Sequence, residues 1–177
     1  MNGNLIWLDM EMTGLNVETE RPIEVACIIT DFDFKELATY ESVIRQPQEF
    51  LDRMDDWNKT HHGESGLLAK IPKGKDPAEV EKDLIDMVRW YFPEGRENAV
   101  LAGNSIMQDR LFIERYFKNF AALLHYRMLD VTAWKIIFKD KFKREYKKKN
   151  QHRALDDIRE SIEELKFYLQ YVKVDTP

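Results

Sequence analysis

The residues best suited to chemistry begin with two carboxylates near the start of the chain. Asp9 and Glu11 stand two positions apart in residues 5–11, a run that is otherwise apolar. Side chains two positions apart on a strand project from the same face, so both carboxylates are expected on one side, opposite Leu8 and Met10. Two adjacent carboxylates repel near neutral pH and are tolerated only in water or beside a cation. An isolated Asp-x-Glu is most often an ordinary exposed strand face, so this pair alone decides nothing.

Three further candidates lie later in the chain. Asp109 follows an apolar stretch and the turn-forming residues 103–105, at the predicted start of a helix. His152 stands at the edge of another predicted helix, and Asp157 lies one turn inside it. An acid in the first turn of a helix is commonly explained by its interaction with the helix dipole. Each feature therefore has an ordinary structural explanation, and only their combination indicates a functional site.

Four carboxylates and one histidine together suit phosphodiester hydrolysis. Carboxylate oxygens select hard cations such as Mg²⁺ or Mn²⁺ over zinc, and the sequence contains no Cys/His cluster. Two such ions about 4 Å apart suit an in-line displacement at phosphorus, because one activates the attacking water and the other stabilises the leaving oxygen. A histidine that titrates near neutrality is a suitable base for that water. The predicted catalytic set is Asp9, Glu11, Asp109, His152 and Asp157, with two divalent ions as cofactors.

The composition is typical of one globular domain. The chain has 177 residues, of which 44% are hydrophobic and 33% charged, so it can bury one large core and is too apolar for disorder. No apolar run approaches the roughly 18 to 20 residues that span a bilayer, and the N-terminus lacks a signal-peptide pattern. Cys27 is the only cysteine, so no intramolecular disulfide can form. We therefore expect a single domain over residues 1–177 in the reducing cytoplasm.

The charge distribution bears on the choice of substrate. A net charge of −5 argues against an extended footprint on long nucleic acid, because such binding relies on Lys and Arg to neutralise phosphates. Residues 135–153 are the exception, with nine Lys or Arg against Asp140 and Glu145, a local balance of +7. Such a run is most often a solvated loop or helix end. Because it borders His152, a role in guiding phosphates stays open.

The elements that must position these residues follow from hydrophobic periodicity and turn signals. An Asp76-Pro77 pair is predicted to cap a helix that has apolar residues at helical spacing. The other predicted elements are strands at residues 5–11, 22–31, 38–46, 99–102 and 126–131, and helices at residues 50–58, 108–120 and 153–171. Three strands followed by alternating helices and strands indicate an α/β domain with a mixed sheet flanked by helices.

Five stretches of the sequence closely resemble the motifs of the oligoribonuclease family, which belongs to the DEDDh exonucleases. In order and spacing they cover nearly the whole chain, at residues 7–15, 57–67, 103–110, 126–131 and 152–161. The resemblance implies a ribonuclease H-like fold, 3′-to-5′ exonuclease polarity and a homodimer. The implied activity is hydrolysis of very short RNAs, especially dinucleotides, to 5′-mononucleotides with two Mg²⁺ or Mn²⁺ ions.

The resemblance also implies a role for each matching catalytic residue. Asp9, Glu11 and Asp157 would be direct metal ligands, with Asp9 shared between both ions. Asp109 would complete the acidic set, partly through water. His152 would be the general base.

The remaining matches would contact the substrate. Leu15 would wedge against the bases, and Trp57 would stack on one of them. His62 would approach the 3′ end of the RNA. A cap over the 5′ phosphate, which limits substrate length, would be formed by Ser105, Arg127, Thr132 and, from the partner subunit, Tyr126.

Departures from the family pattern include two among or beside the predicted substrate contacts. Thr132 stands where Ser is usual, and its hydroxyl keeps the phosphate contact available. His61 beside His62 is unusual and leaves open which imidazole faces the substrate.

Two other functions share part of this pattern. A DEDDh proofreading exonuclease acting on DNA would share the acids and the histidine but would not need Trp57 or the Tyr126-Arg127 pair. A non-catalytic nucleic-acid-binding module on the same fold is disfavoured, because all five catalytic positions carry suitable residues.

Overall fold

A mixed sheet of five strands, in the order β3-β2-β1-β4-β5, forms the centre of the molecule. The computed structural model describes residues 3–93, 99–147 and 154–173. β1 pairs antiparallel with β2 and parallel with β4; β2–β3 is antiparallel and β4–β5 is parallel. The strands are β1 (Asn4–Met12), β2 (Pro22–Asp31), β3 (Glu36–Val43), β4 (Val100–Gly103) and β5 (Met128–Asp130). The predicted five-stranded α/β architecture is confirmed.

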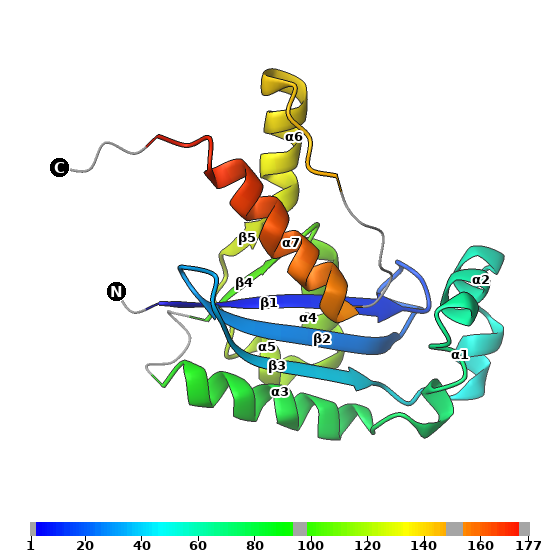
Figure 1. The fold of residues 1–177 in the computed structure, drawn as a ribbon. Coiled ribbons are helices and arrows are strands. Elements are labelled where there is room, and N and C mark those ends of the chain that lie inside the picture. Colours follow the sequence, from blue (N-terminus) through cyan, green and yellow to red (C-terminus); the bar gives the residue numbers. More distant parts are fainter. Residues whose placement is uncertain (1–2, 94–98, 148–153, 174–177) are drawn as a thin grey trace.

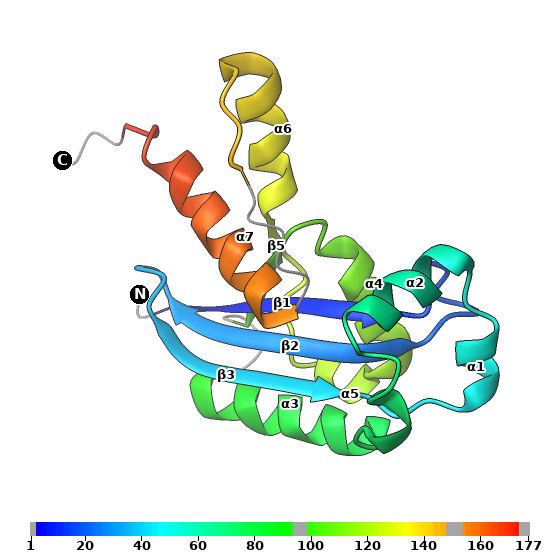
Figure 2. The same ribbon diagram turned by 45° about the vertical axis from the view of Figure 1, so that its right-hand side comes forward.

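Helices cover both faces of this sheet (Figure 1). They are α1 (Gln48–Asp52), α2 (Asp56–Glu64), α3 (Pro77–Tyr91), α4 (Met107–Tyr116), α5 (Lys118–Ala121), α6 (Val131–Phe142) and α7 (Ala154–Leu169), with a 3-10 turn η1 (Ile71–Lys73). α3 runs along one face and α7 crosses the other, while α6 projects away from the sheet in both ribbon views (Figures 1 and 2). No helix in the described parts of the chain is long and apolar enough to cross a membrane.

The central strand β1 separates two apolar cores. Leu8 and Met10 face the core that includes α3, α4 and α5, as predicted, whereas Trp7 faces the core under α6 and α7. Asp9 and Glu11 continue the row of Trp7, because side chains alternate along a strand. The face of β1 that α7 covers is therefore apolar at its start and acidic at its carboxyl end.

Two predicted helices are each divided in the structure. The single helix predicted at residues 50–58 is wrong, because Asp55 begins a new helix, accepting the backbone N–H of Asn58 at 2.8 Å. The helix predicted at residues 108–120 breaks at Phe117, whose φ of −127° lies outside the helical region.

The strand predicted at residues 126–131 is shorter than expected. Asp130 accepts the backbone N–H of Thr132 at 2.8 Å and so caps α6, which was not predicted. Within α6 only Val131 and Phe138 are buried, while Ile136, Ile137 and Phe142 are exposed, so its apolar residues are spread around the helix and do not form one face. The basic stretch, for which a solvated loop or helix end was the commonest interpretation, is helical as far as Phe142.

Candidate active site

Three of the predicted acids meet at the carboxyl end of β1. Carboxylate oxygens of Asp9, Glu11 and Asp157 lie within 4.8 Å of one another, and each residue is half-buried. Asp157 enters from the first turn of α7, which lies over the acidic face of β1. The Ser161 hydroxyl donates to the Asp157 carbonyl at 2.9 Å, and the Asn104 amide donates to Ser161 Oγ at 2.8 Å. These bonds tie the start of α7 to the end of β4.

The electrostatics of this acidic cluster (Asp9, Glu11 and Asp157) favour a bound cation. Burial, together with the nearby carboxylates of Glu24 and Asp157, raises the pKa of Glu11 to about 7. Glu24 is buried directly opposite Glu11 in the antiparallel register of β1 and β2. Carboxylates held this close are stabilised when a cation shares their charge, and an all-oxygen donor set suits a hard divalent ion. The contribution of Glu24 was missed because it depends on strand register, which the sequence alone does not reveal.

Asp109 lies outside this cluster and is more deeply buried. Its Oδ1 accepts the backbone N–H of Met10 at 3.0 Å, which ties α4 to the segment of β1 between Asp9 and Glu11. Burial raises the pKa of Asp109; hydrogen bonds from backbone N–H groups oppose the rise, and the nearby charges of Glu11 and Asp130 add to it. The fourth acid thus contacts the strand that carries the first two.

His62 is the imidazole that lies beside the acids. Its Nε2 is 3.0 Å from the carbonyl oxygen of Met12, and its Nδ1 is 3.9 Å from Glu11 Oε2. Burial lowers the pKa of His62, which favours the neutral ring. Because a carbonyl only accepts, Nε2 carries the proton, and Nδ1 of the neutral ring carries a lone pair. The predicted general base, His152, lies outside the described residues.

His61, next to His62, stacks on the exposed indole of Trp57. The two ring centroids are 4.8 Å apart and the ring planes differ by 10°. His61 also meets His62 edge-on at 5.8 Å. Both imidazoles line a small hollow whose other lining residues are Glu11, Glu24, Ser65, Leu67 and Lys70. His61, His62 and Glu11 of the acidic cluster therefore line the same hollow.

Leu15 projects from the loop between β1 and β2 and is 75% exposed. The Gln108 side chain holds this loop by donating to the Leu15 carbonyl at 2.8 Å. Gln108 directly precedes Asp109 on α4, so one turn of helix contacts both the acidic segment and the Leu15 loop. The sequence carried no signal for this contact, because its partners are far apart in the chain.

Two of the predicted phosphate-binding hydroxyls are adjacent. The Ser105 backbone N–H donates to Thr132 Oγ1 at 2.8 Å and to Asp130 Oδ1 at 3.0 Å. The two hydroxyl oxygens of Ser105 and Thr132 are 3.2 Å apart. Ser105 has a φ of 51°, so the turn after β4 is held in a left-handed conformation that few non-glycine residues adopt.

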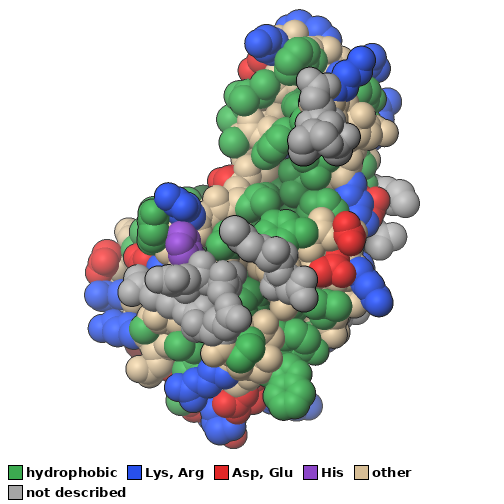
Figure 3. Space-filling view, turned by 90° about the vertical axis from the view of Figure 1, so that its left-hand side faces the viewer, with side chains coloured by type: hydrophobic (Ala, Val, Ile, Leu, Met, Phe, Trp, Pro, Cys, Tyr) green, Lys and Arg blue, Asp and Glu red, His purple; other side chains and the backbone are tan. Residues whose placement is uncertain are grey.

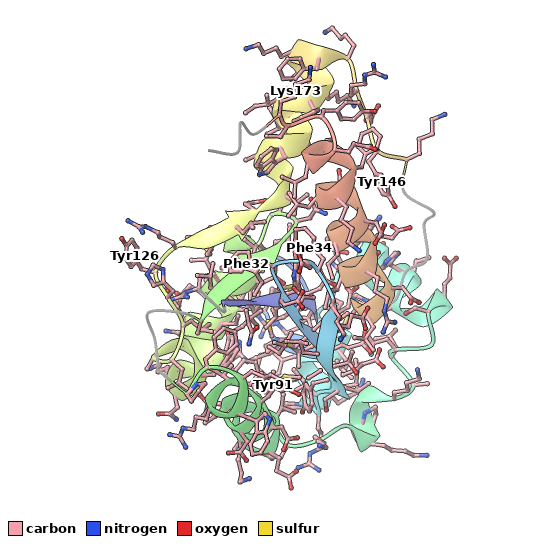
Figure 4. All side chains as sticks on the ribbon, turned by 60° about the vertical axis from the view of Figure 1, so that its left-hand side comes forward. Phe32, Phe34, Tyr91, Tyr126, Tyr146 and Lys173 are labelled. Atoms are coloured by element: carbon pink, nitrogen blue, oxygen red, sulfur yellow. The ribbon has the colours of Figure 1, made fainter. Side chains whose placement is uncertain are left out.

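Tyr126 and Arg127 lie just before β5, the edge strand of the sheet. The Arg127 guanidinium is 5.2 Å from the centroid of the Tyr126 ring, and that ring also stacks on His125 at 4.5 Å. Tyr126 is 67% exposed and projects outward from the edge of the molecule (Figure 4).

Comparisons with known proteins decide the family. The Exonuclease family RNase_T matches residues 6–165. Oligoribonuclease of Ralstonia nicotianae is 44% identical over 181 residues, covering 99% of this chain and 82% of that protein. The Neisseria meningitidis oligoribonuclease is 44% identical over 179 residues, covering 98% and 95%, and the human mitochondrial oligoribonuclease 42% over 174 residues, covering 95% and 73%. The chain belongs to the oligoribonuclease family.

Membership of this family makes the protein a 3′-to-5′ exonuclease, as the sequence motifs predicted. Solved structures agree on the fold. Exonuclease I of E. coli, in complex with a dT13 oligonucleotide, aligns with a TM-score of 0.72 at 12% identity. A moderately thermophilic Exonuclease I from Methylocaldum szegediense aligns with a TM-score of 0.71 at 13% identity. The alignments cover 94% and 96% of this chain but only 41% of each exonuclease I chain, so they establish the shared ribonuclease H-like fold alone.

Proposed function

We propose that this member of the oligoribonuclease family hydrolyses very short RNAs, especially dinucleotides, from the 3′ end to 5′-mononucleotides. The observation that carries the proposal is the meeting of Asp9, Glu11 and Asp157 carboxylates within 4.8 Å. Glu11 also lines the hollow that contains the rings of His61 and His62. The relatives that match nearly the whole chain are named oligoribonucleases, which supports RNA oligonucleotides as the substrate class.

Asp9, Glu11 and Asp157 would hold two divalent ions, Mg²⁺ or Mn²⁺, and Asp109 would complete the acidic set. Bound divalent ions increase the acidity of the attacking water and stabilise charge on the leaving oxygen. The raised pKa of Glu11 fits this role, because the carboxylate gains stability when positive charge replaces its missing solvent.

The protein's own proton acceptor in this scheme is His152. It takes the proton of the attacking water, the task that suits an imidazole near neutral pH. His62 has a separate task. With Nε2–H donated to the Met12 carbonyl, Nδ1 accepts a hydrogen bond from the 3′-terminal ribose and fixes that end beside Glu11.

Base and phosphate contacts complete the proposed substrate site. Trp57 stacks on one base, and Leu15 wedges between the bases. Both side chains are highly exposed, which supports a role in binding rather than in packing. The hydroxyls of Ser105 and Thr132 and the guanidinium of Arg127 hold the 5′ phosphate. A capped 5′ end leaves no room for further nucleotides and so restricts length.

A homodimer completes the cap, with Tyr126 supplied by the partner subunit. The exposed, outward position of Tyr126 supports this arrangement. Ile136, Ile137 and Phe142 of α6 are also more than half exposed, and hydrophobic side chains gather on the projecting part of the molecule (Figure 3). Apolar surface of this kind is typical of protein interfaces. Sedimentation equilibrium should give twice the chain mass for the wild type, and a monomer at micromolar concentration would contradict the arrangement.

We further propose that residues 1–177 act as one exonuclease domain in a reducing compartment such as the cytoplasm. The family match already spans residues 6–165. Cys27 is fully buried, and burial raises the pKa of its thiol to about 12, so it is poorly suited to redox chemistry. Since the human relative is named mitochondrial, fractionation of the native host is the appropriate measurement.

A substrate-length series tests the proposed function. The substrates are 5′-phosphorylated RNAs of two to about seven nucleotides, assayed with Mg²⁺ or Mn²⁺ and with a chelator as control. We expect kcat/KM to be highest for the dinucleotide and to fall at least tenfold along the series, with no hydrolysis in chelator. Rates that are flat or rise with length would contradict the proposal.

A further inference from the structure

The position of His61 on α2 places it under Trp57. Asp55 caps the helix, and Trp57 and His61 follow at positions i and i+4, which are neighbours on one face. Their rings are nearly parallel, 4.8 Å between centroids with 10° between planes. A ring pair at this distance and angle is in stacking contact.

The contact leaves the indole available for a ligand. Trp57 is 68% exposed even though His61 covers part of one face. An exposed tryptophan without such a neighbour samples several rotamers, and binding a ligand on it then costs the entropy of fixing one of them. A stacked imidazole limits those rotamers before the ligand arrives.

We infer that His61 is a positioning residue for Trp57, holding the indole in the orientation in which its open face stacks on a nucleobase. The inference rests on the proposed base-stacking role of Trp57. The three rings Trp57, His61 and His62 form a continuous ring stack, because His61 also meets His62 edge-on at 5.8 Å. The stack runs from the exposed indole to the buried imidazole that lies 3.9 Å from Glu11. His61 thus links the exposed indole of Trp57 to the imidazole of His62, which lies beside Glu11.

Steady-state kinetics on a 5′-phosphorylated diribonucleotide with Mg²⁺ test this role. We expect His61→Ala to raise KM about three- to tenfold, the cost of ordering one rotamer-rich side chain, and to leave kcat within about twofold. His61→Phe keeps a flat ring under the indole and should restore KM. Glu64→Ala, at an exposed position on the same helix, is the matched control and should behave as the wild type. An unchanged KM in His61→Ala, or no rescue by His61→Phe, would overturn the inference.

A double-mutant cycle separates positioning from direct contact. In a Trp57→Ala background, His61→Ala should have no further effect on KM, because its target is gone. The same fold-loss in both backgrounds would mean that His61 contacts the RNA itself, and would overturn the positioning role. If Trp57→Ala alone left KM unchanged, the proposed base-stacking function would fail first, whatever the result for His61.

A readout independent of activity tests the ring contact. Trp90→Phe and Trp134→Phe leave Trp57 and the buried Trp7 as the only tryptophans. In that background, His61→Ala should increase the amplitude of fast motion in the time-resolved fluorescence anisotropy, and His61→Phe should reverse the increase. Equal anisotropy decays in all three proteins would overturn the inference, whatever the kinetic result.

Discussion

The acidic cluster and the ring stack are parts of one site, but they are built in opposite ways. Asp9 and Glu11 project from the central strand of the sheet, and Asp157 from a long helix packed across it. Trp57, at the outer end of the ring stack, stands on a nine-residue helix and is largely exposed. The groups assigned to chemistry are therefore held by the two cores, whereas Trp57, which is assigned to base stacking, is held by contacts within one short helix.

This difference has an energetic consequence. Clustering carboxylates at a half-buried strand end destabilises the metal-free fold, and only the surrounding cores keep them together. Ring contacts at the surface carry no such repulsion. Substitution in the cluster should therefore change the rate greatly and raise the stability of the metal-free protein. Substitution of the exposed Trp57 should change substrate affinity and leave stability nearly unaltered.

The largest effect is expected for Asp157→Asn, with the adjacent Asp156→Asn as matched control. Losing one preorganised charged group from the reacting centre should lower kcat/KM about 10³-fold or more. In chelator, Asp157→Asn should also raise the melting temperature, since one of three close negative charges is removed. Equal activity of the two variants would contradict the catalytic role of Asp157. A lower melting temperature for Asp157→Asn would contradict the claim that the clustered carboxylates destabilise the metal-free fold.

The next largest effect is expected for His152→Ala. Removing a positioned general base should lower kcat about 10²- to 10⁴-fold, with KM changed much less. The acidic limb of the pH–rate profile should also lose the step that belongs to this imidazole. A variant that retained full metal-dependent activity would remove His152 from the mechanism.

Trp57→Ala should show the opposite kinetic signature. Stacking on a base is worth about 1–3 kcal/mol, so KM for a dinucleotide should rise about 5- to 150-fold while kcat changes little. Thermal unfolding in chelator should be close to that of the wild type, because the indole is mostly exposed. A fall in kcat with KM unchanged would contradict the base-stacking role and would mean that Trp57 takes part in the chemical step.

The smallest effect is the pH dependence of stability without metal. Burial and two neighbouring carboxylates raise the pKa of Glu11 from 4.5 to about 7, so the folded state holds this proton more tightly than the unfolded state. Its contribution to stability is fully present below about pH 4.5 and is lost as the pH rises through about 7. Burial lowers the pKa of His62, so its contribution to stability is present at high pH and is lost as the pH falls.

A comparison of wild type with Glu11→Gln isolates the carboxylate. In urea unfolding with chelator, the variant should gain about 1–3 kcal/mol relative to the wild type between pH 4.5 and 8. Saturating Mg²⁺ should reverse the order of the two proteins. A difference that does not vary with pH would show that Glu11 has an ordinary pKa in the folded protein.

The same contrast explains what the sequence could predict. Period-two alternation placed Asp9 and Glu11 on one face of a strand and predicted that Leu8 and Met10 point the other way, as the structure has them. The mixed sheet of five strands followed from the order of apolar segments and turns. Local rules suffice for such features, because strand geometry fixes side-chain direction.

Features that depend on long-range contacts were not predicted. Glu24 faces Glu11 only through strand register, and Gln108 reaches Leu15 only after α4 has packed beside the loop. α6 was not predicted from the sequence. It projects away from the sheet and buries only Val131 and Phe138, so its apolar residues show no clear helical face. Which of the two adjacent histidines lies by the acids was also undecidable from sequence, since it depends on how α2 faces the hollow.

The most direct test of the central claim compares two substrates at equal concentration. Wild-type protein with Mg²⁺ is offered a 5′-phosphorylated diribonucleotide and, separately, a long single-stranded DNA, with Asp157→Asn as the inactive control for each. We predict rapid conversion of the diribonucleotide to 5′-mononucleotides and far slower loss of nucleotides from the DNA. Faster cutting of the DNA would contradict the account and would identify the protein as a DNA exonuclease on the same fold.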